Sequence, residues 1–227
     1  MAEPALEWRN FKNNYKNRSD IHWARKIWHI VTVFGMFLTY QFAPYAVSTS
    51  ILFIACAIMI PFDFIRLKYP KVNDVALIFM GPLMRNTEVK GAAGTTFLLV
   101  GVAVIVSIFS KPVVALSLLF LAFADPLASY AGIRYGKDKL IGNKSAQGFL
   151  MAFVVCFILT FLFLSGCELL FSRRLIISIL CGLVGALAEL IPIAKLDDNL
   201  TMPILSAVGI WAVFQLFGIN LLTAAVE

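Results

Sequence analysis

Long apolar runs, separated by short polar segments, dominate the pattern along this chain. A helix that crosses a membrane needs about 20 consecutive apolar residues. The pattern predicts seven such helices, at residues 27–43, 45–65, 92–110, 112–135, 146–166, 174–194 and 201–224. An eighth stretch, residues 74–85, is too short to cross and is expected to form an interfacial or re-entrant helix. The predicted fold class is therefore all-α, a polytopic membrane helical bundle.

The composition excludes a water-soluble protein. Of the 227 residues, 60% are hydrophobic and only 14% are charged, whereas soluble domains carry about 25% charged residues. The four cysteines lack the spacing of metal ligands and are interpreted as packing residues. We expect a single membrane domain at residues 25–227. It follows a cytoplasmic or interfacial segment at 1–24, where Trp8, Phe11 and Tyr15 share one helical stripe.

The basic residues predict the orientation of the helices, because Lys and Arg accumulate on the cytoplasmic side of membrane proteins. With the N-terminus in the cytoplasm, all of the 19 Lys and Arg residues except Lys111, Arg173 and Arg174 fall on that side. Seven helices with a cytoplasmic N-terminus are therefore expected. The expected location is a cell inner membrane, or a membrane like that of the endoplasmic reticulum.

An aspartate and a proline interrupt the fourth apolar run. A charge at the centre of a membrane costs about 2.5–3.5 kcal/mol, so such residues are functional candidates. Asp125 followed by Pro126 is typical of a helix cap and first turn, which predicts two half-helices here. A stripe of small residues follows at helical spacing: Ala128, Ser129, Gly132 and Gly136. This stripe allows a ligand, or alternatively a neighbouring helix, to approach closely.

Two segments carry cations suited to phosphate. Residues 136–148, GKDKLIGNKSAQG, combine glycines with Lys137, Lys144 and Ser145, although the segment is not a Walker loop. At the start of the first apolar run, four side chains share one helical face: His22, Arg25, Lys26 and His29. Ordinary positive flanking charge accounts for part of this face, and a phosphate site is the functional alternative.

Acidic residues lie near the ends of three other apolar runs. Glu88 and Lys90 precede the third run, and Glu189 lies near the end of the sixth. Asp197, Asp198 and Asn199 precede the seventh. Asp198 or Asn199 is alternatively a helix cap, but clustered carboxylates near a membrane also suit a divalent metal with oxygen ligands.

The predicted topology brings all of these segments to the cytoplasmic side. The sequence therefore predicts one membrane-embedded site that combines carboxylates with cations. Carboxylates that bind Mg²⁺, surrounded by Lys and Arg, are what a nucleoside triphosphate requires.

Four blocks resemble, in the same order, the family of CTP-dependent lipid kinases that includes dolichol kinase, phytol kinase and the yeast-type diacylglycerol kinase. They are RKIWH (25–29), the block of Glu88, Lys90 and Gly94, residues 124–148, and residues 188–203. One position departs from the family pattern, because Gln147 stands where the family has Glu. The third block also resembles the CTP:phosphatidate cytidylyltransferases, but their Ser-Pro-Lys-Lys-Thr stretch is absent.

This resemblance implies transfer of the γ-phosphoryl of a nucleoside triphosphate to a lipid alcohol such as diacylglycerol, phytol or a polyprenol. It implies that Asp125 and Asp198 bind Mg²⁺ and that Glu88 orients or deprotonates the hydroxyl. The residues expected to bind the nucleotide are Arg25, Lys26, His29, Lys90, Gly132, Gly136, Lys137, Lys144, Ser145 and Asn199. A cytidylyltransferase and a transporter remain the alternatives. The sequence leaves open the alcohol, the choice between CTP and ATP, and a homodimer; no motif supports nucleic-acid binding.

Overall fold

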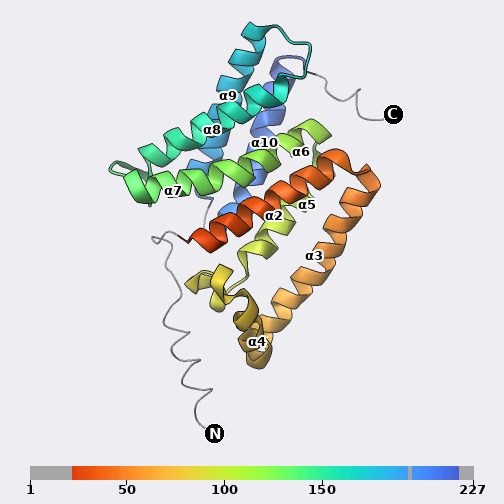
Figure 1. Cartoon of the computed structure of the whole chain (residues 1–227), viewed down its shortest axis with the longest axis vertical. Coiled ribbons are helices and arrows are strands. Elements are labelled where there is room, and N and C mark those ends of the chain that lie inside the picture. The colour runs from red at the N-terminus through yellow and green to blue at the C-terminus, as the bar shows by residue number, and fades with distance from the viewer. Residues whose placement is uncertain (1–21, 194–195, 220–227) are drawn as a thin grey trace.

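The computed structural model describes residues 22–193 and 196–219. The expected interfacial helix in 1–24 falls almost entirely outside these residues. The described chain is helical apart from one short hairpin, which confirms the predicted fold class (Figure 1). Its helices are α2 (Trp23–Phe42), α3 (Tyr45–Lys68), α4 (Pro70–Met80), α5 (Gly94–Ile108), α6 (Lys111–Leu119), α7 (Asp125–Tyr135), α8 (Ala146–Leu164), α9 (Phe171–Leu190) and α10 (Asp198–Leu216).

Each predicted apolar run corresponds to one helical rod, although the runs 174–194 and 201–224 extend past the ends of α9 and α10. Among the described residues, five rods are long and apolar enough to cross a membrane: α3, the continuous rod Lys111–Tyr135, α8, α9 and α10. The helix α5 is apolar but shorter, and α2 is not among the five. With 11 residues, α4 is too short to cross, as predicted for this part of the chain.

The rod Lys111–Tyr135 forms the centre of the bundle. Its most apolar stretch is 72% buried inside the protein, against 17% for α3. The rod packs against α2, α8 and α10, and its middle residues, including Val114 and Phe120, are fully enclosed. By contrast, α3 exposes large apolar side chains such as Ile58 and Phe64, which suits a face in contact with lipid.

The predicted break at Asp125 is wrong. Asp125 has helical angles (φ −58°, ψ −55°), and a π-helical segment, η3 (Phe120–Ala124), joins α6 directly to α7. Pro126 has no N–H and would clash with the carbonyl of the preceding turn in a regular α-helix. A π-helical segment just before it relieves that conflict without ending the helix. Asp125 therefore lies on a continuous helix rather than at a helix cap.

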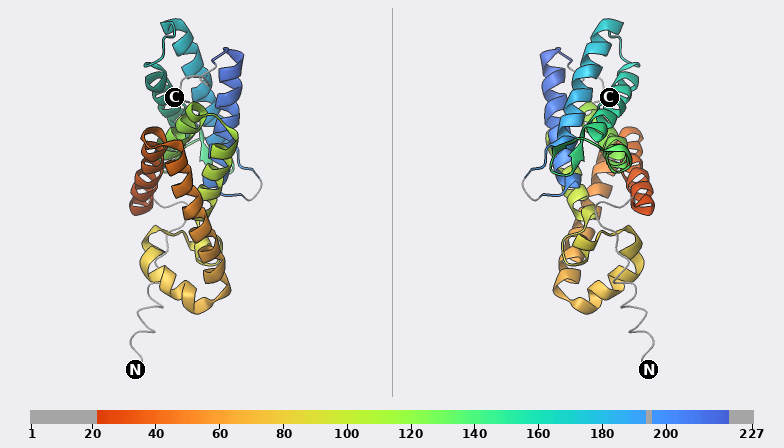
Figure 2. Two further views of the ribbon diagram at one scale, coloured as in Figure 1. Left: turned by 90° about the vertical axis from the view of Figure 1, so that its right-hand side faces the viewer. Right: turned by 90° about the vertical axis from the view of Figure 1, so that its left-hand side faces the viewer.

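Two smaller features complete the fold. The segment after α4 contains the 3₁₀ turns η1 (Gly81–Leu83) and η2 (Asn86–Val89). Figure 2 shows this segment beside the end of α3, and η1 also contacts α2. Between α7 and α8, strands β1 (Lys139–Ile141) and β2 (Lys144–Ser145) form an antiparallel hairpin that the sequence analysis did not predict. Gly142 takes a positive φ of 55° in its turn, a conformation that glycine adopts without steric cost.

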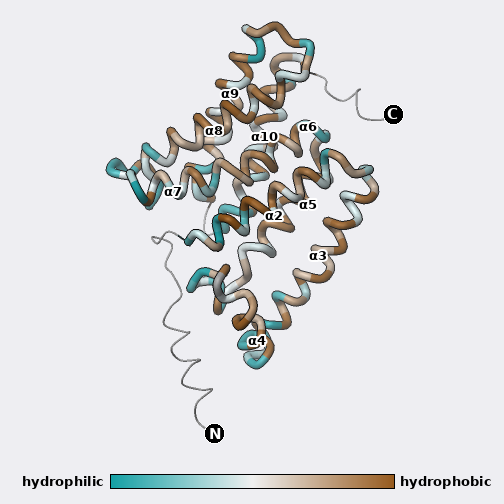
Figure 3. Tube along the Cα trace, in the orientation of Figure 1, coloured by the Kyte–Doolittle hydropathy of each residue, from teal (hydrophilic) through white to brown (hydrophobic). Residues whose placement is uncertain are grey.

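Hydrophilic residues gather in three places along one side of the molecule (Figure 3). These are the hairpin, the start of α2 and the segment between α4 and α5. The segments are far apart in the sequence, so the bundle is what brings their polar side chains together.

Gly185 allows α8 and α9 to pack closely, and its replacement by alanine tests this packing. A Cβ there would overlap Cys156 Sγ and would lie 2.9 Å from Phe120 Cδ2. Overpacking costs about 1–3 kcal/mol, which exceeds the gain of up to about 1 kcal/mol in helix propensity. We expect Gly185→Ala to lower the melting temperature in detergent.

Gly35→Ala is the matched control, because a Cβ at Gly35 meets no other described atom within 4 Å. Its melting temperature should equal that of the wild type or exceed it. Equal melting temperatures for the two variants would contradict the close packing at Gly185.

Candidate functional site

A cavity of about 530 Å³ lies at the polar side of the bundle. Its walls come from α2, Arg85, α7, the hairpin, the start of α8, the end of α9 and the start of α10. Five Lys or Arg side chains line it together with three carboxylates, an excess of two positive charges before the histidines are counted. These charged residues are Arg25, Lys26, Arg85, Lys139, Lys144, Asp125, Glu189 and Asp198. Such a lining suits a polyanionic ligand.

Arg25 is held from behind by Glu88. The guanidinium Nη1 donates to Glu88 Oε2 at 2.9 Å, and Nη2 lies 2.8 Å from Glu88 Oε1. Nη1 also donates to the carbonyl of Leu83 at 3.1 Å. This bidentate pair fixes the plane of the guanidinium. Arg25 therefore lines the cavity in a fixed orientation, whereas Glu88 stands behind it.

Gly94 makes room for this arrangement. A Cβ at Gly94 would lie 2.7 Å from Arg25 Nη2 and 2.9 Å from Asn199 Nδ2. It would also lie 3.1 Å from Glu88 Oε1. A side chain at position 94 would therefore push Arg25 and Asn199 away from their observed positions.

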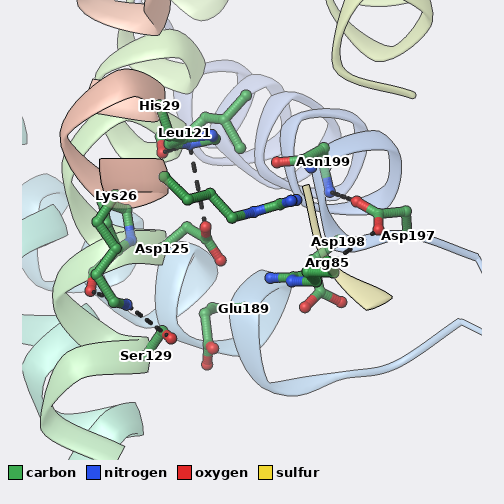
Figure 4. A network of polar contacts seen from close by, with 12 residues as sticks. Lys26, His29, Arg85, Leu121, Asp125, Ser129, Glu189, Asp197, Asp198 and Asn199 are labelled. Carbon is green, nitrogen blue, oxygen red and sulfur yellow. Dashed lines mark hydrogen bonds and ion pairs between the residues drawn. The ribbon is translucent and has the colours of Figure 1, made fainter. Parts of the chain in front are cut away.

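Lys26 and His29 join α2 to the central rod (Figure 4). Lys26 Nζ donates to Ser129 Oγ at 2.9 Å and to the carbonyl of Pro126 at 3.0 Å. His29 Nε2 lies 2.9 Å from the carbonyl of Leu121, within the π-helical segment. A carbonyl oxygen only accepts hydrogen bonds, so Nε2 carries the hydrogen. His29 Nε2 is also 4.0 Å from Asp125 Oδ2.

Lys144 lies among three carboxylates. Its Nζ donates to Glu189 Oε1 at 2.6 Å and to the Glu189 carbonyl at 2.8 Å, and it lies 3.5 Å from Asp198 Oδ2. Burial disfavours the charged ammonium, but Glu189, Asp198 and Asp125 outweigh this effect and raise the pKa of Lys144 above its ordinary value. Lys144 therefore stays protonated at neutral pH, and the three carboxylates around it leave negative charge that a further cation can neutralise.

The start of α10 settles which residue caps that helix. Asp197 is the cap, since its Oδ1 accepts the N–H of Asn199 at 3.0 Å. Asp197 Oδ2 also lies 3.8 Å from Arg85 Nη1. Asp198 and Asn199 are the first helical residues, and both line the cavity. The alternative interpretation of Asp198 or Asn199 as the cap is therefore wrong.

The structure brings most of the predicted site residues to one cavity. Those lining it are Arg25, Lys26, His29, Asp125, Gly132, Gly136, Lys144, Ser145, Asp198 and Asn199. Glu88, Lys90 and Lys137 are not among the described residues that line it. Glu88 is buried against Arg25, and Lys90 and Lys137 are exposed to solvent. The glycines also serve packing, because a Cβ at Gly136 would lie 2.8 Å from Ser145 Oγ.

Three charged residues of the cavity were given no individual role in the predicted site, although Glu189 was among the carboxylates considered for a metal. Glu189 carried a signal, because a carboxylate near the end of an apolar run is costly. Lys139 lay in the basic segment before α8, beside the cations that were selected. Arg85 follows the short stretch 74–85 and looked like ordinary flanking charge. Only the folded segment after α4 brings Arg85 to the cavity.

Gln147, which stands where the family has Glu, binds the residues that lead into the hairpin. Its Oε1 accepts the N–H of Lys137 at 3.1 Å, and its Nε2 donates to Asp138 Oδ2 at 3.2 Å. It is not among the described residues lining the cavity. An amide suits both contacts, because a carboxylate would repel Asp138.

The carboxylates of the cavity suit a metal ion that is also bound by the phosphates of a ligand. Within residues 22–193 and 196–219, no three His, Cys, Asp or Glu side chains are grouped closely enough to hold a metal. Mg²⁺ usually keeps water ligands and binds through one or two carboxylates together with substrate phosphates. Asp125 and Asp198, both in the cavity lining, match that smaller donor set.

Comparison with known proteins places the chain in a family, although no family model and no solved structure matches it. It is 34% identical over 155 residues to CTP-dependent diacylglycerol kinase 1 of Schizosaccharomyces pombe, covering 64% of this chain and 71% of that protein. It is 32% identical over 182 residues to the Saccharomyces cerevisiae protein of the same name, covering 72% of this chain and 63% of that one.

A further relative is an uncharacterized protein of Rickettsia prowazekii, 30% identical over 191 residues, covering 82% of this chain and 91% of that protein. Identity above 30% over most of the fission yeast protein is sufficient to assign the family. The chain therefore belongs to the family of CTP-dependent lipid kinases that its sequence blocks resemble.

Proposed function

We propose that this chain transfers the γ-phosphoryl group of CTP to the hydroxyl of a membrane lipid alcohol, with diacylglycerol as the first acceptor to test. The observation that carries the proposal is a cavity in which cations and carboxylates meet at the polar side of an apolar bundle. The names of three relatives support both the nucleotide and the lipid.

The cations of the cavity are suited to the triphosphate. Arg25 presents a planar fork of donors that matches phosphate oxygens, and Glu88 fixes its orientation. Lys26 adds positive charge from the same helix, and Arg85 and Lys144 add it from two other parts of the lining. Phosphoryl transfer needs mainly positioning and neutralisation of charge. These side chains would supply both.

Asp125 and Asp198 would hold Mg²⁺ in this proposal. When bound, Mg²⁺ neutralises charge on the phosphate oxygens. Lys144, whose pKa is raised, stays charged beside these carboxylates. It limits their mutual repulsion before the nucleotide arrives.

The lipid hydroxyl, which accepts the phosphoryl group, would be made reactive mainly by its position in the site. The bond between the γ-phosphorus and the oxygen bridging to the β-phosphate breaks, a bond to the lipid oxygen forms, and CDP leaves. The hydroxyl proton passes to a cavity carboxylate or to water. Both oxygens of Glu88 already face Arg25, so we propose that Glu88 orients Arg25 instead of acting as the base.

We also propose seven membrane-spanning helices with the cavity on the cytoplasmic side. A reporter fused after Lys139 should be cytoplasmic, and one fused near Ser172 should be external, because α8 separates the two positions. The distribution of Lys and Arg motivates this expectation. Reporter activity on the same side for both fusions would contradict the topology.

The decisive reaction uses CTP labelled at either the α- or the γ-phosphate. Purified protein with Mg²⁺ is supplied with diacylglycerol, phytol, a long polyprenol or phosphatidate. A kinase moves only the γ-phosphoryl, so we expect γ-label in an alcohol and release of CDP. A cytidylyltransferase reacts at the α-phosphorus, so α-label in phosphatidate with release of pyrophosphate would overturn the proposal.

The variant Asp125→Asn belongs to the same experiment. An amide is a poorer ligand for Mg²⁺ than a carboxylate, so transfer of γ-label should fall by at least about 100-fold. Asp74→Asn is the matched control, because Asp74 is exposed on α4 and does not line the cavity. It should retain wild-type activity. Near-normal transfer by Asp125→Asn would remove Asp125 from the mechanism.

A further inference from the structure

A second group of buried charges lies outside the cavity, near the end of α3. The side chains of Arg66 and Asp63 are only 1% and 4% exposed. Arg66 Nε donates to Asp63 Oδ1 at 2.6 Å, and Nη2 lies at the same distance from that oxygen. Burying two charges is expensive, and a buried ion pair often contributes no more stability than apolar residues of similar size. Stability alone therefore gives little reason to place this pair here.

The pair holds the backbone of the segment that precedes α5. Arg66 Nη1 donates to the carbonyl of Glu88 at 3.2 Å, and Nη2 donates to that of Gly91 at 2.8 Å. Nη1 also donates to Asn73 Oδ1 at 2.9 Å, and Asn73 Nδ2 donates to the Val89 carbonyl at 3.1 Å. With the bond from Nε to Asp63, these hydrogen bonds involve all three nitrogens of the guanidinium.

Asp63 holds the other end of the same segment. Its Oδ2 accepts the N–H of Ala93 at 2.9 Å and the hydroxyl of Thr96 at 2.9 Å. The ion pair thus fixes the backbone on both sides of Gly91, where no regular helix or strand holds residues 90–93.

This segment connects the ion pair to the cavity. It carries Glu88, whose carboxylate orients Arg25, and Gly94, which faces Arg25 and Asn199. Glu88 Oε2 also accepts the N–H of Arg85 at 3.2 Å. A shift of residues 88–94 would therefore displace the guanidinium that faces the ligand.

We propose that Asp63 and Arg66 are positioning residues for nucleotide binding: by fixing residues 88–93 they hold Glu88, and through it Arg25, against the triphosphate. This inference rests on the proposed kinase function. It extends the site to a buried pair on α3 that touches neither substrate.

Arg66→Lys tests the inference, because lysine keeps the charge but has three donors and no planar fork. Three quantities are measured for each variant in one detergent: the Kd of CTP by calorimetry, the KM of the lipid, and the melting temperature. We expect the Kd of CTP to rise about tenfold, the size expected when contacts that orient a charged group are lost. The KM of the lipid should change less than about twofold, because the pair acts only through the phosphate-binding side.

A double-mutant cycle with Arg25→Lys separates positioning from general stability. If Arg66 acts through Arg25, then Arg66→Lys should not weaken CTP binding further in the Arg25→Lys background, although it should still lower the melting temperature. Losses of CTP affinity that add in the double variant would overturn the inference. If wild-type protein bound no CTP, the proposed function itself would fail, which is a distinct outcome.

Leu164→Ala is the control for destabilisation without repositioning. Leu164 is fully buried at the far end of α8, and its truncation leaves a void that costs about 2–5 kcal/mol. Its melting temperature should fall while the Kd of CTP stays unchanged. Thr96→Val, which removes only the hydroxyl donor to Asp63, provides a milder variant should Arg66→Lys not fold. We expect it to raise the Kd of CTP about threefold, and an unchanged Kd would contradict the inference.

Discussion

The pairing of two cavity cations, Lys144 and Arg25, with carboxylates is the constraint on which the rest of this structure depends. Lys144 is held by Glu189, and Arg25 is held by Glu88. An isolated charge beside an apolar bundle would be too costly to keep. Once paired, both cations remain charged and oriented at the cavity before any ligand arrives. A site prepared in this way loses little further order when it binds a triphosphate.

The helical bundle provides the fixed frame for these pairs. The central rod stays helical through Asp125 because backbone groups in an apolar surrounding must be hydrogen-bonded within the protein. The π-helical segment accommodates Pro126, and the Leu121 carbonyl meets His29 of α2. Asp125 is thereby placed beside the cationic face of α2. The π-helical segment thus both accommodates Pro126 and places the carboxylate of Asp125.

The sequence predicted the helices well because long apolar runs leave the chain few alternatives. The prediction of a helix break at Asp125–Pro126 was wrong. The pattern of a helix cap is local, whereas the burial of the whole rod favours a continuous helix. The sequence predicted the cations of α2, whose helical spacing fixes a common face. It could not decide which side chains of an irregular segment face the cavity, so Lys90 and Lys137 were selected and Arg85 was missed. Arg66 was counted only as flanking charge, because the backbone carbonyls that it holds lie 22 and 25 residues ahead in the sequence.

The central claim is that the triphosphate binds inside this cavity, between the cations of α2 and the hairpin. The most direct measurement is an experimental structure with Mg²⁺ and a non-hydrolysable analogue of CTP. We expect phosphate oxygens within hydrogen-bond distance, about 3 Å, of Arg25 and Lys144, with the metal at Asp125 and Asp198. A triphosphate bound at the exposed Lys90 or Lys137, outside the cavity, would contradict it.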